Sequence, residues 1–269
     1  MPEVTQDQRG GLPIVYRPGD PLADDATASI GGRRPKASEA TAELIVQDIV
    51  SNGYQVGDRM PPESEMLERI GVSRETLREA LRILEAQGVL TIRRGPGGGP
   101  LINALNASYL ARTSALYFHL SGSTHEELFE SWAFIEPLMS AKVASLPNRR
   151  WKLDRLGPFQ EYDPNEHTRG EVISELNDFH GAIAAMSGNR VLTLLTQSID
   201  HIVVHQVLQR IDPQEKGPTM AHSHHEIARA IIDGYATKAR KLMEQHIREV
   251  IAWTRERHPE IMGQLIEWR

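Results

Sequence analysis

Apolar residues recur three or four positions apart along most of the chain, and this spacing places them on one face of an α-helix. In the first third of the chain the pattern predicts three helices, over residues 36–50, 61–71 and 74–87. Two short β-prone runs, 89–92 and 101–102, flank a glycine-rich segment and predict a β-hairpin. Three helices followed by a hairpin form the element order of a winged helix-turn-helix.

Beyond residue 103 the helical spacing continues almost throughout, and regular strand alternation is absent. Glycine, proline or asparagine separates the helical segments, which lie at about 104–121, 124–146, 168–187, 189–211, 219–234 and 236–256. We therefore expect an all-α second domain, an antiparallel bundle of six or seven helices. The predicted fold class of the whole chain is mainly α.

The chain divides into four predicted regions. Residues 1–34 are rich in Gly, Pro, Asp and Ala without helical or strand periodicity, which predicts a flexible N-terminal arm. The winged helix-turn-helix is expected over residues 35–103, the helical domain over 104–258, and a C-terminal tail over 259–269. All eleven histidines lie after residue 102, which indicates that the two domains have different tasks.

The composition limits the classes of partner. The chain has no cysteine, so disulfides and thiolate metal sites are excluded, and no stretch approaches eighteen uninterrupted apolar residues. Because a secretory profile is also lacking, we expect a cytoplasmic protein without a membrane partner. The net charge of −6 argues against nucleic acid at first sight. Residues 33–94 are neutral, however, with ten basic and ten acidic side chains, so DNA binding would depend on basic residues gathered on one face.

The third predicted helix carries the side chains best suited to reading DNA. Arg74 and Arg78 are four residues apart and share one face, away from the apolar stripe. The first turn of such a helix meets base edges in the major groove, where arginine bridges two acceptors of guanine. Ser73 and Thr76 can donate hydrogen bonds to phosphates. The alternatives are that the arginines only solvate an exposed helix face, or that the domain is an adaptor that binds protein.

Three consecutive runs, Met60–Leu67, Ile70–Leu81 and Leu84–Leu90, resemble the N-terminal domain of the GntR family of transcription regulators. Glu75 departs from the small polar residues often found at its position, and it would either accept a hydrogen bond from cytosine N4 or repel a phosphate. The resemblance to the FadR subfamily of these regulators implies that DNA is contacted by Ser64, Arg74, Thr76, Arg78, Arg94 and Gly95.

Three histidine motifs in the helical domain, at 179–183, 224–231 and 243–247, resemble the FCD-type C-terminal ligand-binding domain of the FadR subfamily. In many such domains one aspartate and three histidines hold a divalent metal that helps to bind a carboxylate effector. The resemblance implies Zn²⁺ or Ni²⁺ at this site. The alternative is that the histidines are hydrogen-bonded core residues. The three histidine positions are His180, His224 and His246.

Two positions depart from the resemblance. Leu176 stands where the aspartate ligand is expected, and the neighbouring Asn177 would be a weak neutral ligand. Trp132 stands where an arginine is common. Both changes make the pocket less polar, which favours a more apolar organic acid or an acyl thioester as effector. His201 and His205, one helical turn apart, either line the same cavity or lie on the surface.

These features predict a regulator that binds double-stranded DNA at an inverted repeat as a homodimer and responds to a small effector. The family resemblance implies that it acts as a repressor. A metal-dependent enzyme built on the histidine-rich domain is the main rival. The sequence offers it no His-Glu-x-x-His motif, no Gly-x-Ser-x-Gly elbow and no complete P-loop. We therefore expect no enzymatic activity.

Overall fold

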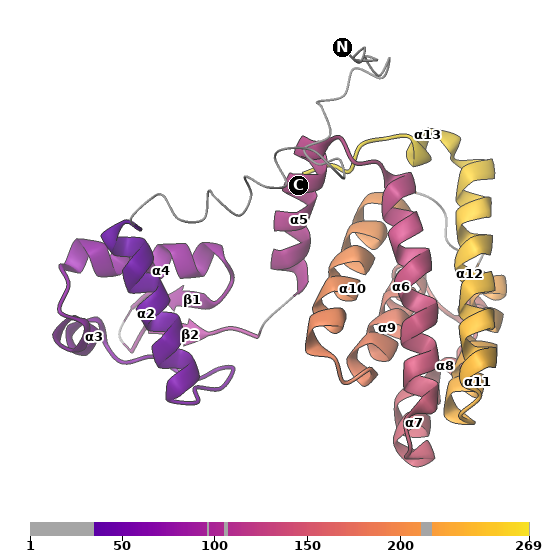
Figure 1. Ribbon diagram of the computed structural model, residues 1–269, viewed down its shortest axis with the longest axis horizontal. Coiled ribbons are helices and arrows are strands. Elements are labelled where there is room, and N and C mark those ends of the chain that lie inside the picture. The colour runs from indigo at the N-terminus through magenta and orange to yellow at the C-terminus, as the bar shows by residue number, and fades with distance from the viewer. Residues whose placement is uncertain (1–34, 96, 105–106, 211–216, 269) are drawn as a thin grey trace, which may run out of the picture. The chain divides into compact units, whose positions relative to one another are not determined.

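A computed structural model describes residues 35–95, 97–104, 107–210 and 217–268 (Figure 1). The predicted N-terminal arm, residues 1–34, lies outside the described residues. The described chain forms two compact units that divide after Tyr109, and each unit has its own hydrophobic core. The fold is mainly helical with one small antiparallel sheet, as the sequence predicts.

The N-terminal unit contains the three predicted helices and the hairpin. In the hairpin Leu90 pairs with Ile102 and Arg93 pairs with Gly99, so the glycine-rich segment forms the turn. The elements are α2 (Ala37–Ser51), α3 (Glu63–Ile70), α4 (Arg74–Ala86), β1 (Leu90–Arg93) and β2 (Gly99–Ile102).

Local sequence signals set the boundaries between α3 and α4. Gly71 ends α3 in the left-handed region at φ 74°, a conformation that glycine adopts without steric cost. Ser73 then caps α4, because its side chain accepts a hydrogen bond from the Thr76 backbone N–H. One face of α4 is buried against the core through Leu77 and Leu84, and its basic side chains remain on the opposite face.

The C-terminal unit is a helical bundle. Each of the six predicted segments corresponds to one long helix, and three shorter helices were not predicted from the sequence. The long helices are α5 (Ala107–Ser121), α6 (His125–Ser145), α9 (Arg169–Met186), α10 (Arg190–Val203), α11 (Gly217–Ile232) and α12 (Ala236–Arg257). The short helices are α7 (Arg149–Leu156), α8 (Pro158–Glu161) and α13 (Pro259–Met262).

The long helices pack around one apolar core. Helix α12 lies beside α6 and α11, and α10 lies beside α9 and α6 (Figure 1). Thr124 and Thr168 start α6 and α9 with capping boxes, in which the threonine and a glutamate three residues later satisfy each other's backbone N–H groups. The side chains of Phe129, Phe179 and Ile227 are fully buried between these helices. The core therefore draws on helices that are far apart in the sequence.

Two segments differ from the sequence prediction. The predicted continuous helix 189–211 changes at Val204 into a π-helical segment that ends at Leu208. π-Helical turns are frequent at functional sites. The predicted tail, 259–269, contains α13, and its Ile266 side chain is buried. Among the described residues, Arg190–Leu208 is the one helical stretch that is long and apolar enough to cross a membrane, and half of it is buried inside the bundle.

Candidate functional site

The first turn of α4 presents polar and basic side chains to solvent. Arg74, Glu75 and Arg78 are exposed, and Thr76 is half-buried. The Ser73 hydroxyl lies 3.1 Å from the Thr76 backbone nitrogen and 2.8 Å from the Thr76 hydroxyl. The Ser73 hydroxyl therefore caps the helix and is already engaged in hydrogen bonds within this turn.

The guanidinium of Arg78 is held by a carboxylate from the preceding helix. Its Nε lies 3.1 Å from Oε1 of Glu63, at the start of α3. The Arg78 side chain remains 63% exposed, so the pair is a surface ion pair of little energetic weight. An anionic group such as a phosphate would therefore compete with Glu63 for this arginine at little energetic cost.

The other predicted DNA-contact residues lie on exposed parts of the same unit. Ser64 is exposed in the first turn of α3, and Arg94 and Gly95 are exposed in the hairpin turn. Gly95 has a φ of 97°, which a residue with a side chain rarely adopts. Arg59 donates a hydrogen bond to the Gly97 carbonyl and so ties the turn to the segment before α3.

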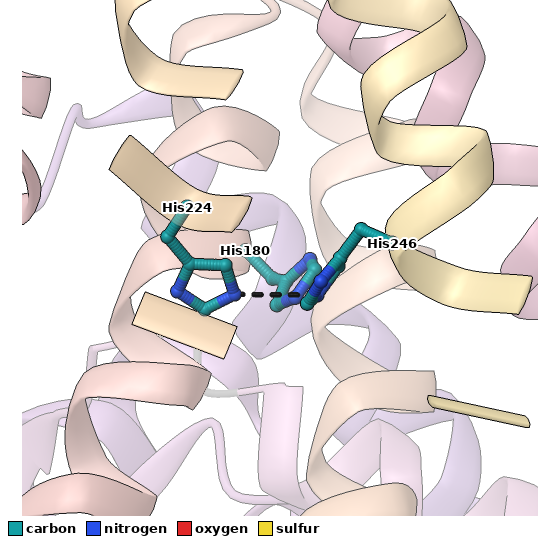
Figure 2. A group of neighbouring side chains, drawn as sticks. All are labelled: His180, His224 and His246. Carbon is teal, nitrogen blue, oxygen red and sulfur yellow. Dashed lines mark hydrogen bonds between the residues drawn. The ribbon is translucent and has the colours of Figure 1, made fainter. Parts of the chain in front are cut away.

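Three buried histidines meet inside the helical unit (Figure 2). His180 comes from α9, His224 from α11 and His246 from α12, and each is at most 4% exposed. One nitrogen of each ring lies within 4.8 Å of the corresponding nitrogens of the other two. The Nε2 atoms of His224 and His246 are 3.3 Å apart. The three motif positions are therefore brought together at one point.

Two glutamates orient these rings. His180 Nδ1 lies 3.0 Å from Glu136 Oε2, and His224 Nδ1 lies 3.0 Å from Glu175 Oε1. Where the carboxylate is ionised it only accepts, so Nδ1 donates, and in a neutral ring Nε2 then keeps its lone pair. Histidines that bind metals typically have this arrangement, with a carboxylate on the nitrogen remote from the ion.

The sequence reading missed both glutamates, although a signal was present. Glu136 lies one turn after Trp132 on the buried stripe of α6. Glu175 lies between Val172 and Phe179 on the buried stripe of α9. A carboxylate on an otherwise apolar stripe indicates that it pairs with a charged or hydrogen-bonding group in the core.

Burial and neighbouring charges shift the proton affinities of this cluster. Burial lowers the pKa of His224 well below its ordinary value, and the charge of His180 lowers it further. Burial by itself would also lower the pKa of His180, but the attraction and hydrogen bond of Glu136 outweigh it and raise that pKa. Burial raises the pKa of Glu175 to about 7. His224 is therefore a neutral imidazole at physiological pH, the form that binds metal.

The residues fit a divalent metal ion. The Nε2 atoms of His224 and His246 are at hydrogen-bond distance, 3.3 Å, and either a proton or a cation between them would satisfy both nitrogens. Three buried imidazoles on separate helices, two of them oriented by carboxylates, form a donor set suited to Zn²⁺ or Ni²⁺.

A small cavity of about 20 Å³ adjoins the histidines. It is lined mainly by apolar side chains, together with His180 and His246. Trp132, Leu176 and Asn177 are among its lining residues. Leu176 offers the site no oxygen ligand.

His201 and His205 are not among the described residues that line the cavity. Their rings lie 4.2 Å apart, His205 is exposed, and its Nδ1 is hydrogen-bonded to the Gln209 side chain. The sequence left open whether this pair lines the cavity or lies on the surface. The structure places the pair away from the cavity.

One lining residue was not expected from the sequence. Asp200, on α10, is 4% exposed and lines the cavity. It occupies the buried stripe of its helix, one turn after Thr196 and three residues before Val203. As with the two glutamates, a charged residue on an otherwise apolar stripe was the signal in the sequence that could have identified it.

Comparisons with known proteins agree with the two-domain reading. Residues 37–98 match the family described as "Bacterial regulatory proteins, gntR family", and residues 127–249 match the FCD domain. The chain is similar to the Uxu operon regulator of Haemophilus influenzae, with 27% identity over 77% of this chain and 78% of the relative. It is also similar to the Glc operon transcriptional activator of Escherichia coli K12, with 25% identity over 81% of this chain and 88% of the relative.

Among solved structures, a GntR protein of Streptococcus agalactiae shares the fold, with a TM-score of 0.60 and 24% identity over 79% of this chain and 98% of that chain. The matched domains and relatives are transcription regulators, so the rival reading as an enzyme is not supported. The chain belongs to the GntR family of transcription regulators and carries an FCD-type effector-binding domain.

Proposed function

We propose that this regulator binds an inverted-repeat operator as a homodimer and represses transcription until a small effector binds its helical domain. The observation that carries the proposal is the exposed first turn of α4, with Arg74 and Arg78 on the face opposite the buried stripe. One short helix contacts too few base pairs for useful specificity, and twofold symmetry doubles the contact. Such a protein works in the cytoplasm, on double-stranded DNA.

In this proposal the contacts divide into two classes. Arg74 and Arg78 read base edges, while residues at the starts of α3 and α4 and in the hairpin turn bind the phosphate backbone. Glu75 restricts the operator, because a carboxylate beside the groove accepts from cytosine but repels phosphate. The backbone contacts come from Ser64, Ser73, Thr76, Arg94 and Gly95.

In the helical domain, His180, His224 and His246 would hold a divalent metal through their Nε2 atoms. When bound, the metal supplies a positive charge that attracts an anionic effector group. Glu136 and Glu175 hold two of the rings in the required tautomer. Phe179, whose ring stacks on His224 at 3.9 Å, fixes the plane of that imidazole.

The size and lining of the cavity restrict which effectors can bind. At about 20 Å³ it has room for little more than a water molecule, so an organic effector binds only as the bundle opens. The cavity wall formed by Leu176, Val203 and Leu208 is apolar, which favours an effector with an apolar body, an organic acid or an acyl thioester. An effector that prefers the opened bundle shifts the regulator toward the state that releases DNA.

The direct test is a fluorescence anisotropy titration of the full-length protein with DNA from upstream of its own gene. We expect saturable, sequence-specific binding that weakens as salt is raised, because phosphate contacts release counterions. Analytical ultracentrifugation of the complex should give two chains per DNA duplex. Equal affinity for the upstream region and for random DNA would contradict the proposed operator, and one chain per duplex would contradict the dimer.

A further inference from the structure

The helical unit buries one carboxylate that neither histidine pair uses. Asp200 lines the cavity with His180 and His246, and neither of its carboxylate oxygens has a partner at hydrogen-bond geometry among the described residues. Burial raises the pKa of Asp200 well above its ordinary value and repulsion from Glu136 raises it further, although an interaction with the Trp132 side chain acts to lower this pKa. A buried carboxylate without a partner is costly, and proteins keep one where it binds a cation or a ligand.

Most of the unpaired polar atoms lie on α6 and α10, two helices that pack against each other. On α6 they belong to Trp132, Glu136 and Ser140, which are spaced four residues apart. On α10 the same spacing separates Thr196 and Asp200. Six of the seven buried side-chain atoms without a partner in the described chain belong to these five residues. Of these five residues Trp132 and Asp200 line the cavity, so a polar occupant there would meet unpaired donor and acceptor atoms.

The charges around the histidines indicate the sign of that occupant. Glu136, Glu175 and Asp200 all act electrostatically on His180. No lysine or arginine is found among the described residues that line the cavity. Since Glu136 and Glu175 are already paired with imidazoles, Asp200 is the carboxyl group left for a divalent cation, whose charge would favour its ionised form.

We propose that Asp200 supplies the carboxylate of the metal site, in place of the aspartate that the family resemblance expects at position 176. Leu176 lines the same cavity and lies four residues before His180, on the same face of α9. Asp200 lies outside the 4.8 Å cluster of imidazole nitrogens, so it reaches the ion by side-chain rotation or through one water. In this chain the carboxylate of the site thus comes from α10 and not from α9. This inference rests on the proposed three-histidine site.

The test compares Zn²⁺ and Co²⁺ binding by tag-free, full-length wild type with that by Asp200→Asn. Competition with a chromophoric chelator gives the Zn²⁺ dissociation constant, and visible absorption of bound Co²⁺ reports the ligand set. We expect Asp200→Asn to bind Zn²⁺ at least about 10-fold more weakly, because even partners outside the ligand shell are worth 10- to 100-fold. The Co²⁺ spectrum should change as well. Asp178→Asn, on the exposed side of α9, is the matched control and should bind as wild type does.

Thermal melting adds a signature that a purely structural role would not produce. Without metal, Asp200→Asn should melt at the wild-type temperature or above it, because the substitution removes a buried carboxyl group whose oxygens are unpaired. With saturating Zn²⁺ it should melt below wild type. If Asp200→Asn does not fold, the double variant Leu176→Asp/Asp200→Asn tests the proposal in its place. It returns the carboxylate to α9 and should bind Zn²⁺ more tightly than Leu176→Asn/Asp200→Asn.

The possible results distinguish the role of Asp200 from the three-histidine site itself. Unchanged Zn²⁺ affinity and an unchanged Co²⁺ spectrum in Asp200→Asn, with binding lost in His246→Ala, would overturn the role of Asp200 and leave the three-histidine site standing. Absence of binding by wild type would overturn both. In the double variants, equal affinities with asparagine and aspartate at position 176 would also overturn the inference.

Discussion

Replacing Glu136 by glutamine tests how the cluster orients its histidines. The Glu136 side chain is fully buried on α6, and its Oε2 accepts from His180 Nδ1 at 3.0 Å. Glutamine keeps the shape and an acceptor oxygen but removes the negative charge. Loss of such an outer partner typically weakens metal binding by about 10- to 100-fold, or about 1.4–2.8 kcal/mol.

The expected effect on stability follows from linkage. Zn²⁺ at 100 times the wild-type dissociation constant stabilises the folded protein by about 2.7 kcal/mol. At the same concentration, a variant with 10- to 100-fold weaker binding gains only about 1.4 to 0.4 kcal/mol. A domain of this size shifts its melting temperature by roughly 2–4 °C per kcal/mol, so the difference is measurable.

The assay is differential scanning fluorimetry of tag-free protein, first with EDTA and then with a Zn²⁺ titration. Glu130→Gln, an exposed substitution on the same helix, is the matched control and should keep the wild-type response. If Glu136→Gln gains as much stability from Zn²⁺ as wild type does, the carboxylate does not support a metal ligand, and the pair with His180 is only a core hydrogen bond.

Two further predictions concern the N-terminal unit. Ser73→Ala removes the acceptor for the Thr76 N–H and should lower the free energy of unfolding by about 1 kcal/mol, measured in urea, while Ser73→Thr should not; equal losses in both variants would show that the hydroxyl is not the cap. Glu63→Gln removes the competitor of Arg78 and should strengthen DNA binding by up to about 1 kcal/mol in anisotropy titrations. Weaker binding would instead mean that Glu63 positions the arginine.

Much of the fold was predictable because its signals are local. The spacing of Leu77, Leu81 and Leu84 fixes the buried face of α4, and Ser73 and Gly71 mark the boundary with α3. The short helix α7 gave no comparable signal, because its sequence is mostly polar and one of its buried residues is Lys152. The Lys152 ammonium donates to the Ala144 carbonyl, a partner that no periodicity reveals.

The histidine cluster was predictable only in part. The resemblance located the three histidines, since their motifs are local. Their acceptors Glu136 and Glu175 lie 44 and 49 residues away along the chain, and Asp200 is contributed by yet another helix. Which carboxylate faces which imidazole depends on how the helices pack, and a single sequence does not specify that packing. A charged residue on an apolar stripe shows that a partner exists but not which residue it is.

The central claim is that the first turn of α4 reads base edges, and a specificity ratio tests it most directly. Competition anisotropy at fixed salt would measure affinity for the operator relative to random DNA in wild type, Arg74→Ala and Arg78→Ala. Arg229→Ala, an exposed arginine of the helical unit, controls for the loss of one positive charge. Losing a bidentate base contact costs about 1–3 kcal/mol, so we expect each α4 variant to lower the ratio by roughly 5- to 150-fold and Arg229→Ala to leave it unchanged. Wild-type ratios in both α4 variants would contradict the account.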